Sequence, residues 1–169
     1  MVDTTPSPAR GVSRRSLVKG AAWSVPVIAV AAATPLAAAS TATNVGNFSL
    51  DGTCGVLGVL GPGFTLTAGA VALPVGTVIN ITGSGIANIG VFSVTGGTAN
   101  VNVLSPTSAQ ITLTAPLAAG ATAAFRTTLS ISVAFGLSAT LTLPSGFVAG
   151  PTAKATGGVN ATLVLCSSN

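Results

Sequence analysis

Two cysteines, Cys54 and Cys166, are the residues of this sequence best suited to covalent chemistry. Thiols in an oxidising compartment outside the cytoplasm most often pair. We therefore expect an intramolecular disulfide that ties the first strand region to the last. Two free buried thiols or an intermolecular bridge are the alternatives. A metal site is not expected, because two thiols without histidine, glutamate or further cysteine do not complete a tetrahedral set of ligands.

Titratable side chains are too few for the usual kinds of catalysis. Beyond residue 39 the sequence contains no histidine, glutamate or tyrosine, and its charged residues there are Asp51, Arg126 and Lys154. A Ser-His-Asp triad and a pair of catalytic carboxylates are therefore excluded. A Ser-Lys dyad through Lys154 is the remaining option, but segment 150–157 resembles an exposed loop with a solvated lysine. We expect neither an enzyme nor a cofactor.

The charged residues have ordinary structural roles in this interpretation. Arg126 lies on the polar side of a predicted strand, where Asp51 is its available partner for a surface ion pair of small energetic value. Asp51-Gly52 is expected to be a turn. It is not expected to bind a cation, because calcium needs several oxygen ligands and usually several carboxylates.

The first 39 residues have the three parts of an export signal. A polar, basic segment ends at Lys19, an apolar run follows over residues 20–36, and Ala37-Ala38-Ala39 offers the small residues that a signal peptidase needs. Cleavage after Ala39 would make Ser40 the mature start. We then expect a short flexible lead over residues 40–46 and a single domain over residues 47–169.

The basic segment contains Ser13-Arg14-Arg15-Ser16-Leu17-Val18-Lys19. This stretch resembles the twin-arginine (Tat) signal, Ser/Thr-Arg-Arg-x-Phe-Leu-Lys, with Leu17 and Val18 as conservative departures. The continuation from Lys19 to Val27 is similar to signals of exported actinobacterial proteins. The resemblance implies two partners, the twin-arginine export machinery and signal peptidase, and a secreted or envelope-associated location.

An uncleaved transmembrane anchor is the alternative reading of the apolar run, which is nearly long enough to cross a bilayer. Pro26, Pro35, the high alanine content and the cleavage motif favour removal. A lipoprotein is disfavoured because the first cysteine, Cys54, lies well past the signal. No stable membrane span is expected after cleavage.

The net charge of +4 belongs mainly to the signal, which holds Arg10, Arg14, Arg15 and Lys19. Without it the net charge is about +1. Nucleic-acid binding is not expected, because phosphate contacts need several basic residues on one face. The solvent-facing surface must consist of Thr, Ser, Asn and Gly, which gives little charge repulsion to oppose association.

The segment Phe125–Phe135 has the clearest strand pattern. A period of two over this length predicts one half-buried strand. The apolar residues on one side are Phe125, Leu129, Ile131, Val133 and Phe135, and the polar residues on the other are Arg126, Thr128, Ser130 and Ser132.

Shorter segments repeat this alternation. Gly96-Gly97 predicts a hairpin between two of them, and Ser105-Pro106-Thr107-Ser108 predicts another turn. Val159–Cys166 is expected to be the final strand. The phenylalanines Phe64, Phe92, Phe125 and Phe135 are expected to face the core. The other predicted strands lie at residues 64–67, 78–82, 91–95, 100–103, 110–114 and 137–143.

Short strands spaced about ten residues apart, with Gly and Pro between them, predict an all-β fold. We favour an antiparallel immunoglobulin-like β-sandwich, with a small β-barrel or jelly roll as the alternative. Residues 72–82 and 111–122 resemble immunoglobulin-like repeat domains of bacterial surface proteins. That resemblance implies an extracellular structural or interaction domain and supplies no binding residues.

Two functions follow as expectations. The first is an exported, non-catalytic structural or adhesive domain that acts through surface packing or binding, with cell-wall polymer or another copy of itself as partner. The second is an extracellular carrier of a small apolar ligand in a cavity between the sheets. Carbohydrate platforms usually use Trp or Tyr, and the sequence has neither beyond the signal.

Overall fold

Alternating buried and exposed side chains run along most strands of the structure, a computed structural model that describes residues 42–55, 61–85, 88–127, 134–162 and 165–169. No helix occurs among these residues. The strands are β1 (Thr43–Asn44), β2 (Ser49–Thr53), β3 (Gly63–Thr67), β4 (Val78–Ser84), β5 (Phe92–Thr95), β6 (Ala99–Ser105), β7 (Ser108–Leu113), β8 (Thr122–Thr127), β9 (Phe135–Thr142), β10 (Phe147–Val148), β11 (Thr156–Ala161) and β12 (Cys166–Ser168).

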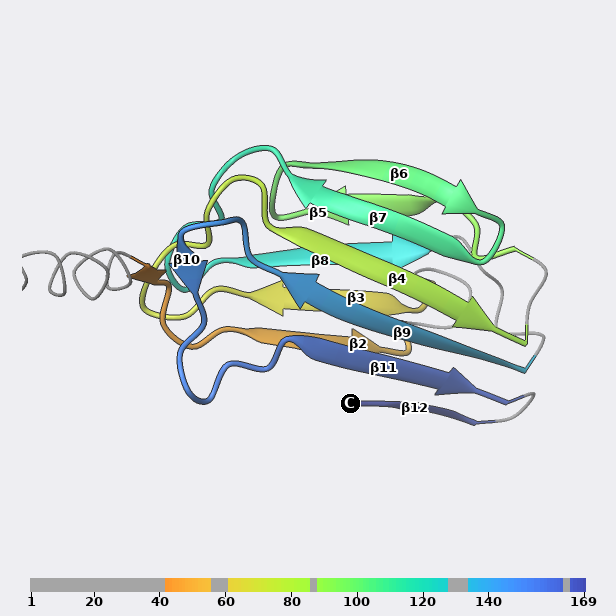
Figure 1. Cartoon of the computed structure of the whole chain (residues 1–169). Coiled ribbons are helices and arrows are strands. Elements are labelled where there is room, and N and C mark those ends of the chain that lie inside the picture. Colours follow the sequence, from red (N-terminus) through yellow and green to blue (C-terminus); the bar gives the residue numbers. More distant parts are fainter. Residues whose placement is uncertain (1–41, 56–60, 86–87, 128–133, 163–164) are drawn as a thin grey trace, which may run out of the picture. The chain divides into compact units, whose positions relative to one another are not determined.

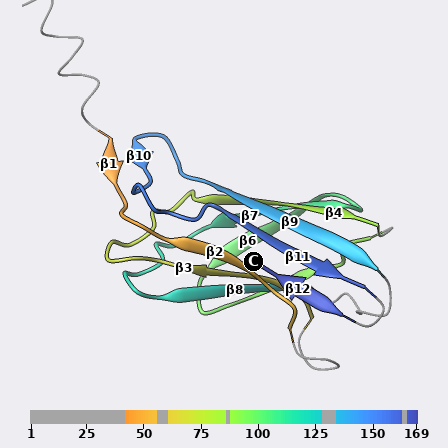
Figure 2. The same cartoon turned by 90° about the horizontal axis from the view of Figure 1, so that it is seen from below.

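Most of these strands belong to two antiparallel sheets packed on each other. The six-stranded sheet has the order β12-β11-β9-β4-β7-β6, and the four-stranded sheet has the order β2-β3-β8-β5. Figure 1 and Figure 2 show them as separate layers, with the parallel pair β1 and β10 at one end. The expectation of an all-β fold with antiparallel strands is confirmed. The predicted signal, residues 1–39, lies outside the described residues.

Apolar side chains from both sheets fill the space between the layers. In β9 the buried residues Phe135, Leu137, Ala139 and Leu141 alternate with more exposed ones, as expected for a strand with one face in the core. All four phenylalanines expected to face the core are buried. The largest fully buried side chains are Phe64, Phe125, Leu50, Leu66, Leu73, Ile79, Ile81, Ile89, Ile111, Leu113, Val45 and Val159.

The fold includes part of the segment that we expected to be a flexible lead, residues 40–46. Thr43–Asn44 forms β1, and Val45 is 1% exposed within the core. The N–H of Val45 donates to the carbonyl oxygen of Val148 at 3.0 Å. The chain is therefore tied to the two-layered unit from Thr43 onward.

The prediction of one strand over Phe125–Phe135 is wrong. Its first residues end β8, which lies in the four-stranded sheet, and Phe135 begins β9, which lies in the six-stranded sheet. The remaining residues of the pattern, 128–133, lie outside the described residues. A period of two identifies strand residues, but it does not show that two of them belong to the same sheet.

The hairpin predicted at Gly96-Gly97 is also wrong. β5 pairs with β8 in one sheet, and β6 pairs with β7 in the other, so the two glycines carry the chain between the layers. Gly96 has a positive φ of 75°, and a Cβ there would overlap the carbonyl oxygen of Thr122. Glycine is required at this crossing because it tolerates both constraints.

Two further expectations near the ends of the domain need correction. Val159–Cys166 is not one strand, because β11 ends at Ala161 and β12 begins at Cys166 as its antiparallel neighbour. Asp51-Gly52 is not a turn, because both residues lie within β2.

The turn predicted at Ser105–Ser108 is confirmed as the connection between β6 and β7, where the two terminal serine hydroxyls lie 2.7 Å apart.

Candidate functional site

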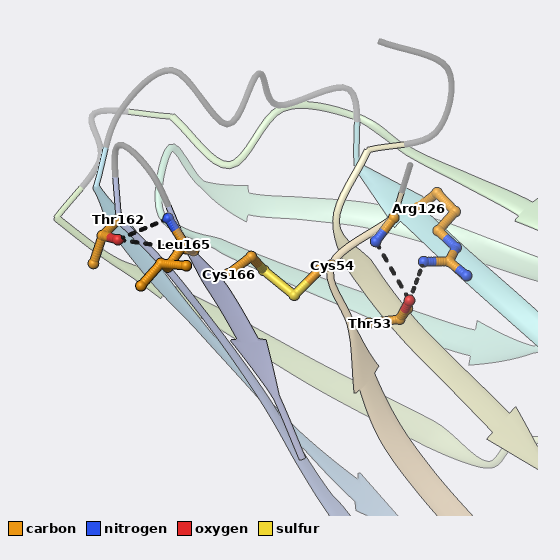
Figure 3. Close-up of a disulfide and its surroundings, with 7 residues drawn as sticks. Thr53, Cys54, Arg126, Thr162, Leu165 and Cys166 are labelled. Atoms are coloured by element: carbon orange, nitrogen blue, oxygen red, sulfur yellow. Dashed lines mark hydrogen bonds between the residues drawn. A yellow bond between two sulfur atoms is a disulfide. The ribbon is translucent and has the colours of Figure 1, made fainter. Parts of the chain in front are cut away.

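The disulfide joins the two sheets. Cys54 follows β2, an edge strand of the four-stranded sheet, and Cys166 begins β12, an edge strand of the six-stranded sheet. Their sulfur atoms are bonded across a sequence separation of 112 residues, with the two Cα atoms 5.9 Å apart. Figure 3 shows the bond bridging the two layers. The predicted pairing is confirmed.

Polar contacts flank the disulfide on both sheets (Figure 3). On the four-stranded sheet, Nη1 of Arg126 donates a hydrogen bond to Oγ1 of Thr53 at 2.8 Å. Next to the six-stranded sheet, between the end of β11 and the start of β12, the backbone N–H of Leu165 donates to Oγ1 of Thr162 at 3.1 Å. The expected pairing of Arg126 with Asp51 is therefore wrong, because the guanidinium bonds to the neighbouring threonine.

Asp51 pairs instead with Lys154. Nζ of Lys154 lies 2.6 Å from Oδ1 of Asp51, and both side chains are two-fifths or more exposed. Hydrogen bonds from Lys154, and then from Ser49, lower the pKa of the Asp51 carboxyl below its ordinary value. The ammonium of Lys154 thus contacts a carboxylate, and nothing among the described residues supports the Ser-Lys dyad.

The backbone of Lys154 is fixed on β2, although we expected it in an exposed loop. Its N–H donates to the carbonyl oxygen of Phe48 at 2.8 Å, and its own carbonyl oxygen accepts from Leu50 N–H at 2.8 Å. This short ladder continues toward β11 and brings the segment before that strand against the four-stranded sheet. The ion pair with Asp51 extends a backbone contact that exists without it.

Backbone bonds close one side of the two sheets, which we call the closed side: β2 against β11 and β12. Gly52 N–H donates to the carbonyl oxygen of Asn169 at 2.6 Å, and Asn169 N–H donates to that of Gly158 at 3.1 Å. A Cβ on Gly52 would overlap the Gly158 carbonyl oxygen. The absence of a side chain at Gly52 is what permits this approach.

Uncharged polar side chains cover the outward-facing side of the six-stranded sheet, which we call the outer face. Adjacent strands lie about 4.8 Å apart, and the strand registers align these residues in rows. One row is Asn102, Gln110, Asn80, Thr140 and Thr156, and another is Ser108, Thr82 and Ser138. A further row is Asn100, Thr112 and Thr142, with the apolar Val78 between the two threonines.

Hydrogen bonds between strands order the outer face. Nε2 of Gln110 donates to Oδ1 of Asn80 at 3.1 Å, and the hydroxyls of Thr82 and Ser138 lie 2.8 Å apart. Among the described residues, the charged side chains lie on β2, on β8 and in the loop before β11, and none lies in a strand of this sheet. The outer face therefore offers hydrogen-bond donors and acceptors without charged side chains among them.

Sequence reasoning missed this face as a unit, although its signal was present. The alternating Thr, Ser, Asn and Gln of each strand were recognised as the solvent side, but their alignment depends on strand order and register. The residues of the predicted export motif, Ser13, Arg14, Arg15 and Lys19, and those of the cleavage site, Ala37 and Ala39, lie outside the described residues.

Metal sites and membrane spans are two other kinds of feature that the described residues could contain. No group of three or more His, Cys, Asp or Glu side chains is placed to hold a metal ion in this part of the chain. The described ranges also contain no helix that is long and apolar enough to cross a membrane.

Comparison with known proteins adds no family. No protein-family model matches the sequence, and the search of curated proteins found no match. The arrangement of this chain's own residues is therefore the basis on which a function can be proposed.

Proposed function

We propose that this protein is an exported, non-catalytic structural or adhesive domain that works at the cell envelope or outside the cell. The outer face is the observation that carries the proposal, because it is a broad, ordered and uncharged array of hydrogen-bonding side chains. Such a surface suits a partner that offers repeated hydroxyl and amide groups, as cell-wall polymer does.

Repetition gives this kind of surface its strength. One hydrogen bond to a partner contributes only about 0.5–1.5 kcal/mol after the loss of bonds to water. Rows of similar groups on adjacent strands let a repeating polymer make many such bonds at once, and the joined contacts raise the overall affinity. A face without charge also binds with little dependence on ionic strength.

Export and fold type complete the proposal. The stretch Ser13-Arg14-Arg15 with Lys19 supports recognition by twin-arginine machinery, and Ala37 with Ala39 supports cleavage by signal peptidase. A structural disulfide is consistent with an extracellular location.

Two packed antiparallel sheets with separate edges support an immunoglobulin-like sandwich over a closed barrel.

Co-sedimentation with isolated actinobacterial cell wall tests the proposed function. We expect the protein to pellet with the wall, and the double variant Asn80→Ala/Gln110→Ala to weaken binding by about tenfold or more, since it removes groups from the central row. Thr65→Ala on the outward side of the four-stranded sheet is the matched control and should bind as the unaltered protein does.

Two results would contradict the proposal. One is a protein that neither pellets with wall nor self-associates. The other is equal loss of wall binding in the outer-face variant and in the Thr65 control. Export is tested separately by the intact mass of the protein recovered outside the cells. We expect a chain that begins at Ser40, with a mass that increases when the disulfide is reduced.

A further inference from the structure

The edge strand β6 lacks most of the devices that keep sheet edges apart. It pairs with β7 on one side and with no strand on its other side among the described residues. Its sequence, Ala-Asn-Val-Asn-Val-Leu-Ser, has no proline and no charge. Native proteins commonly protect such edges with lysine, proline or a bulge. The bulge here lies between Val103 and Ser105, so Ala99–Val103 remains regular.

The hydrogen-bond pattern shows which backbone groups of β6 point away from the sheet. Thr114 N–H donates to the carbonyl oxygen of Thr98 at 3.0 Å, so Thr98 faces β7. Bonding direction alternates along an antiparallel strand. Asn100 and Asn102 therefore also bond toward β7. The N–H and C=O groups of the three intervening residues point outward at the free edge; these residues are Ala99, Val101 and Val103.

The same three residues present an apolar strip along the inner side of the edge. Ala99 and Val101 pack against the core, and Val103 lies opposite the buried Ala109. Val103 is nevertheless 51% exposed, although its position in the alternation directs it inward. The edge of the six-stranded sheet thus leaves apolar surface uncovered next to unpaired backbone groups.

We propose that two copies of this protein associate through β6, antiparallel and about a twofold axis at Val101. In this register Val101 faces Val101 of the second copy, and Ala99 faces its Val103. Each facing pair exchanges two backbone hydrogen bonds. Every outward N–H and C=O group of Ala99, Val101 and Val103 is then used on both copies, and the two sheets become one.

Side-chain chemistry supports a second copy as the partner. Because the register preserves the alternation, the valines of each copy cover the apolar strip of the other, and Asn100 faces Asn102 across the outer face. In this arrangement the aliphatic pairs cover apolar surface, and the facing asparagine amides lie close enough on adjacent strands to interact. The strands of this sheet carry no charge, so the twofold axis brings no like charges together.

Other registers use the edge less well. A shift of one residue places valine against asparagine and points outward groups away from their partners. A twofold axis at Asn102 pairs Val101 with Val103 but places Ala99 opposite Ser105, beyond the bulge. The bulge therefore disfavours the register centred on Asn102.

Sedimentation velocity on the full chain, purified from an exporting host with whatever processing that host performs, tests this interface. We expect a reversible dimer with a dissociation constant in the micromolar range, as small interfaces give. Val101→Pro should weaken the dimer by about tenfold or more, because proline removes an outward N–H while the bonds to β7 remain. Far-ultraviolet circular dichroism verifies that this variant is folded.

A second pair of variants keeps the test valid should Val101→Pro fail to fold. Val103→Lys places a charge at the edge and should dissociate the dimer, whereas Thr140→Lys adds the same charge at the centre of the outer face and should leave the dimer intact. A monomer at all accessible concentrations would overturn the proposal, as would a dimer that is insensitive to both edge variants.

Cross-linking tests the register itself. The native cysteines are paired, so a cysteine introduced elsewhere is the available thiol. Val101→Cys lies on the proposed axis and should form a disulfide-linked dimer on mild oxidation, while Asn102→Cys lies off the axis and should cross-link much less. Equal yields would overturn the register.

This interface lies at the edge of the sheet, and its failure is distinguishable from failure of the proposed function. If the protein is a monomer that still pellets with cell wall, the proposed dimer is wrong and the proposed function stands. If the protein is a dimer that does not pellet with cell wall, the proposed wall binding is wrong and the proposed contact through β6 stands.

Discussion

The closed side and the opposite, open side of the two sheets differ in how their edge strands are held. On the closed side, β2 lies against β11 and β12, and backbone bonds between Gly52, Asn169 and Gly158 are reinforced by the disulfide. On the open side, β5 and β6 are the edges of their sheets and are connected through the sheet crossing at Gly96.

The comparison separates residues that stabilise the folded chain from residues that are available to bind a partner. Residues of the closed side are used by contacts within the chain, so substitutions there should change the free energy of unfolding. Within the part of the chain that the structure describes, the open side keeps backbone groups and apolar surface free. Substitutions there should change association and leave the monomer nearly as stable. The following predictions test that separation, starting with the largest effect.

Removal of the disulfide should have the largest effect. Replacing Cys54 and Cys166 by alanine frees a closed loop with a sequence separation of 112 residues. The chain-entropy model assigns about 4–5 kcal/mol to such a loop. We expect urea denaturation to show a loss of this size. Val103→Ala on the open side is the control and should cost about 1 kcal/mol or less. A loss below that of the control would show that the bridge is dispensable.

Adding a methyl group to the closed side should have the next largest effect. A Cβ on Gly52 overlaps the Gly158 carbonyl oxygen, so Gly52→Ala must push β2 away from β11. We expect thermal unfolding to show a loss of about 1–3 kcal/mol. Ser93→Thr also adds a methyl group, at an exposed position of β5, and should change stability by less than about 0.5 kcal/mol. Equal losses would contradict the contrast.

The smallest effect concerns the ion pair on the closed side. Asp51→Asn should cost at most about 1 kcal/mol at pH 7, because the pair is substantially exposed. The pKa of Asp51 is lowered in the folded protein, so its contribution is complete above its ordinary value of 3.8 and is lost as the pH falls through the folded pKa. The difference in the free energy of unfolding between Asp51→Asn and the unaltered protein should therefore shrink toward zero in acid.

Denaturation at several pH values measures this trend. Lys154→Gln provides the matched variant, and the double variant should cost no more than either single one if the two residues act as a pair. A difference that grows below the ordinary pKa of aspartate would contradict the sign.

The sequence predicted strands more reliably than their partners. Alternation located most of β3, β4, β7 and β9, and the turn at Ser105–Ser108 follows from residues that favour local hydrogen bonds. The disulfide also followed, because two cysteines in a domain that the sequence predicts to be exported leave few choices. The strands and the turn depend on residues that are close in sequence. The disulfide depends only on there being two cysteines to pair.

Features set by distant contacts were predicted poorly. Gly96-Gly97 suits a hairpin and a crossing between sheets equally well, and only the partners of β5 and β6 decide between them. Asp51-Gly52 has the composition of a turn, yet Gly52 is needed where β2 approaches β11. Arg126 finds Thr53, and not Asp51, because the strand register fixes which side chains are neighbours. The rows of the outer face depend on register in the same way.

The position of the disulfide in the chain also has a kinetic consequence. During synthesis from the N-terminus, Cys54 leaves the ribosome long before Cys166, and the contacts of β2 with β11 and β12 can form only after the end of the domain has been made. Pairing between such distant segments makes folding slow, because a large loop must close before its contacts form. A nascent chain cut short before β12 would lack one thiol and the partner of Gly52. Incomplete translation products of this protein should thus be prime substrates for quality-control proteases.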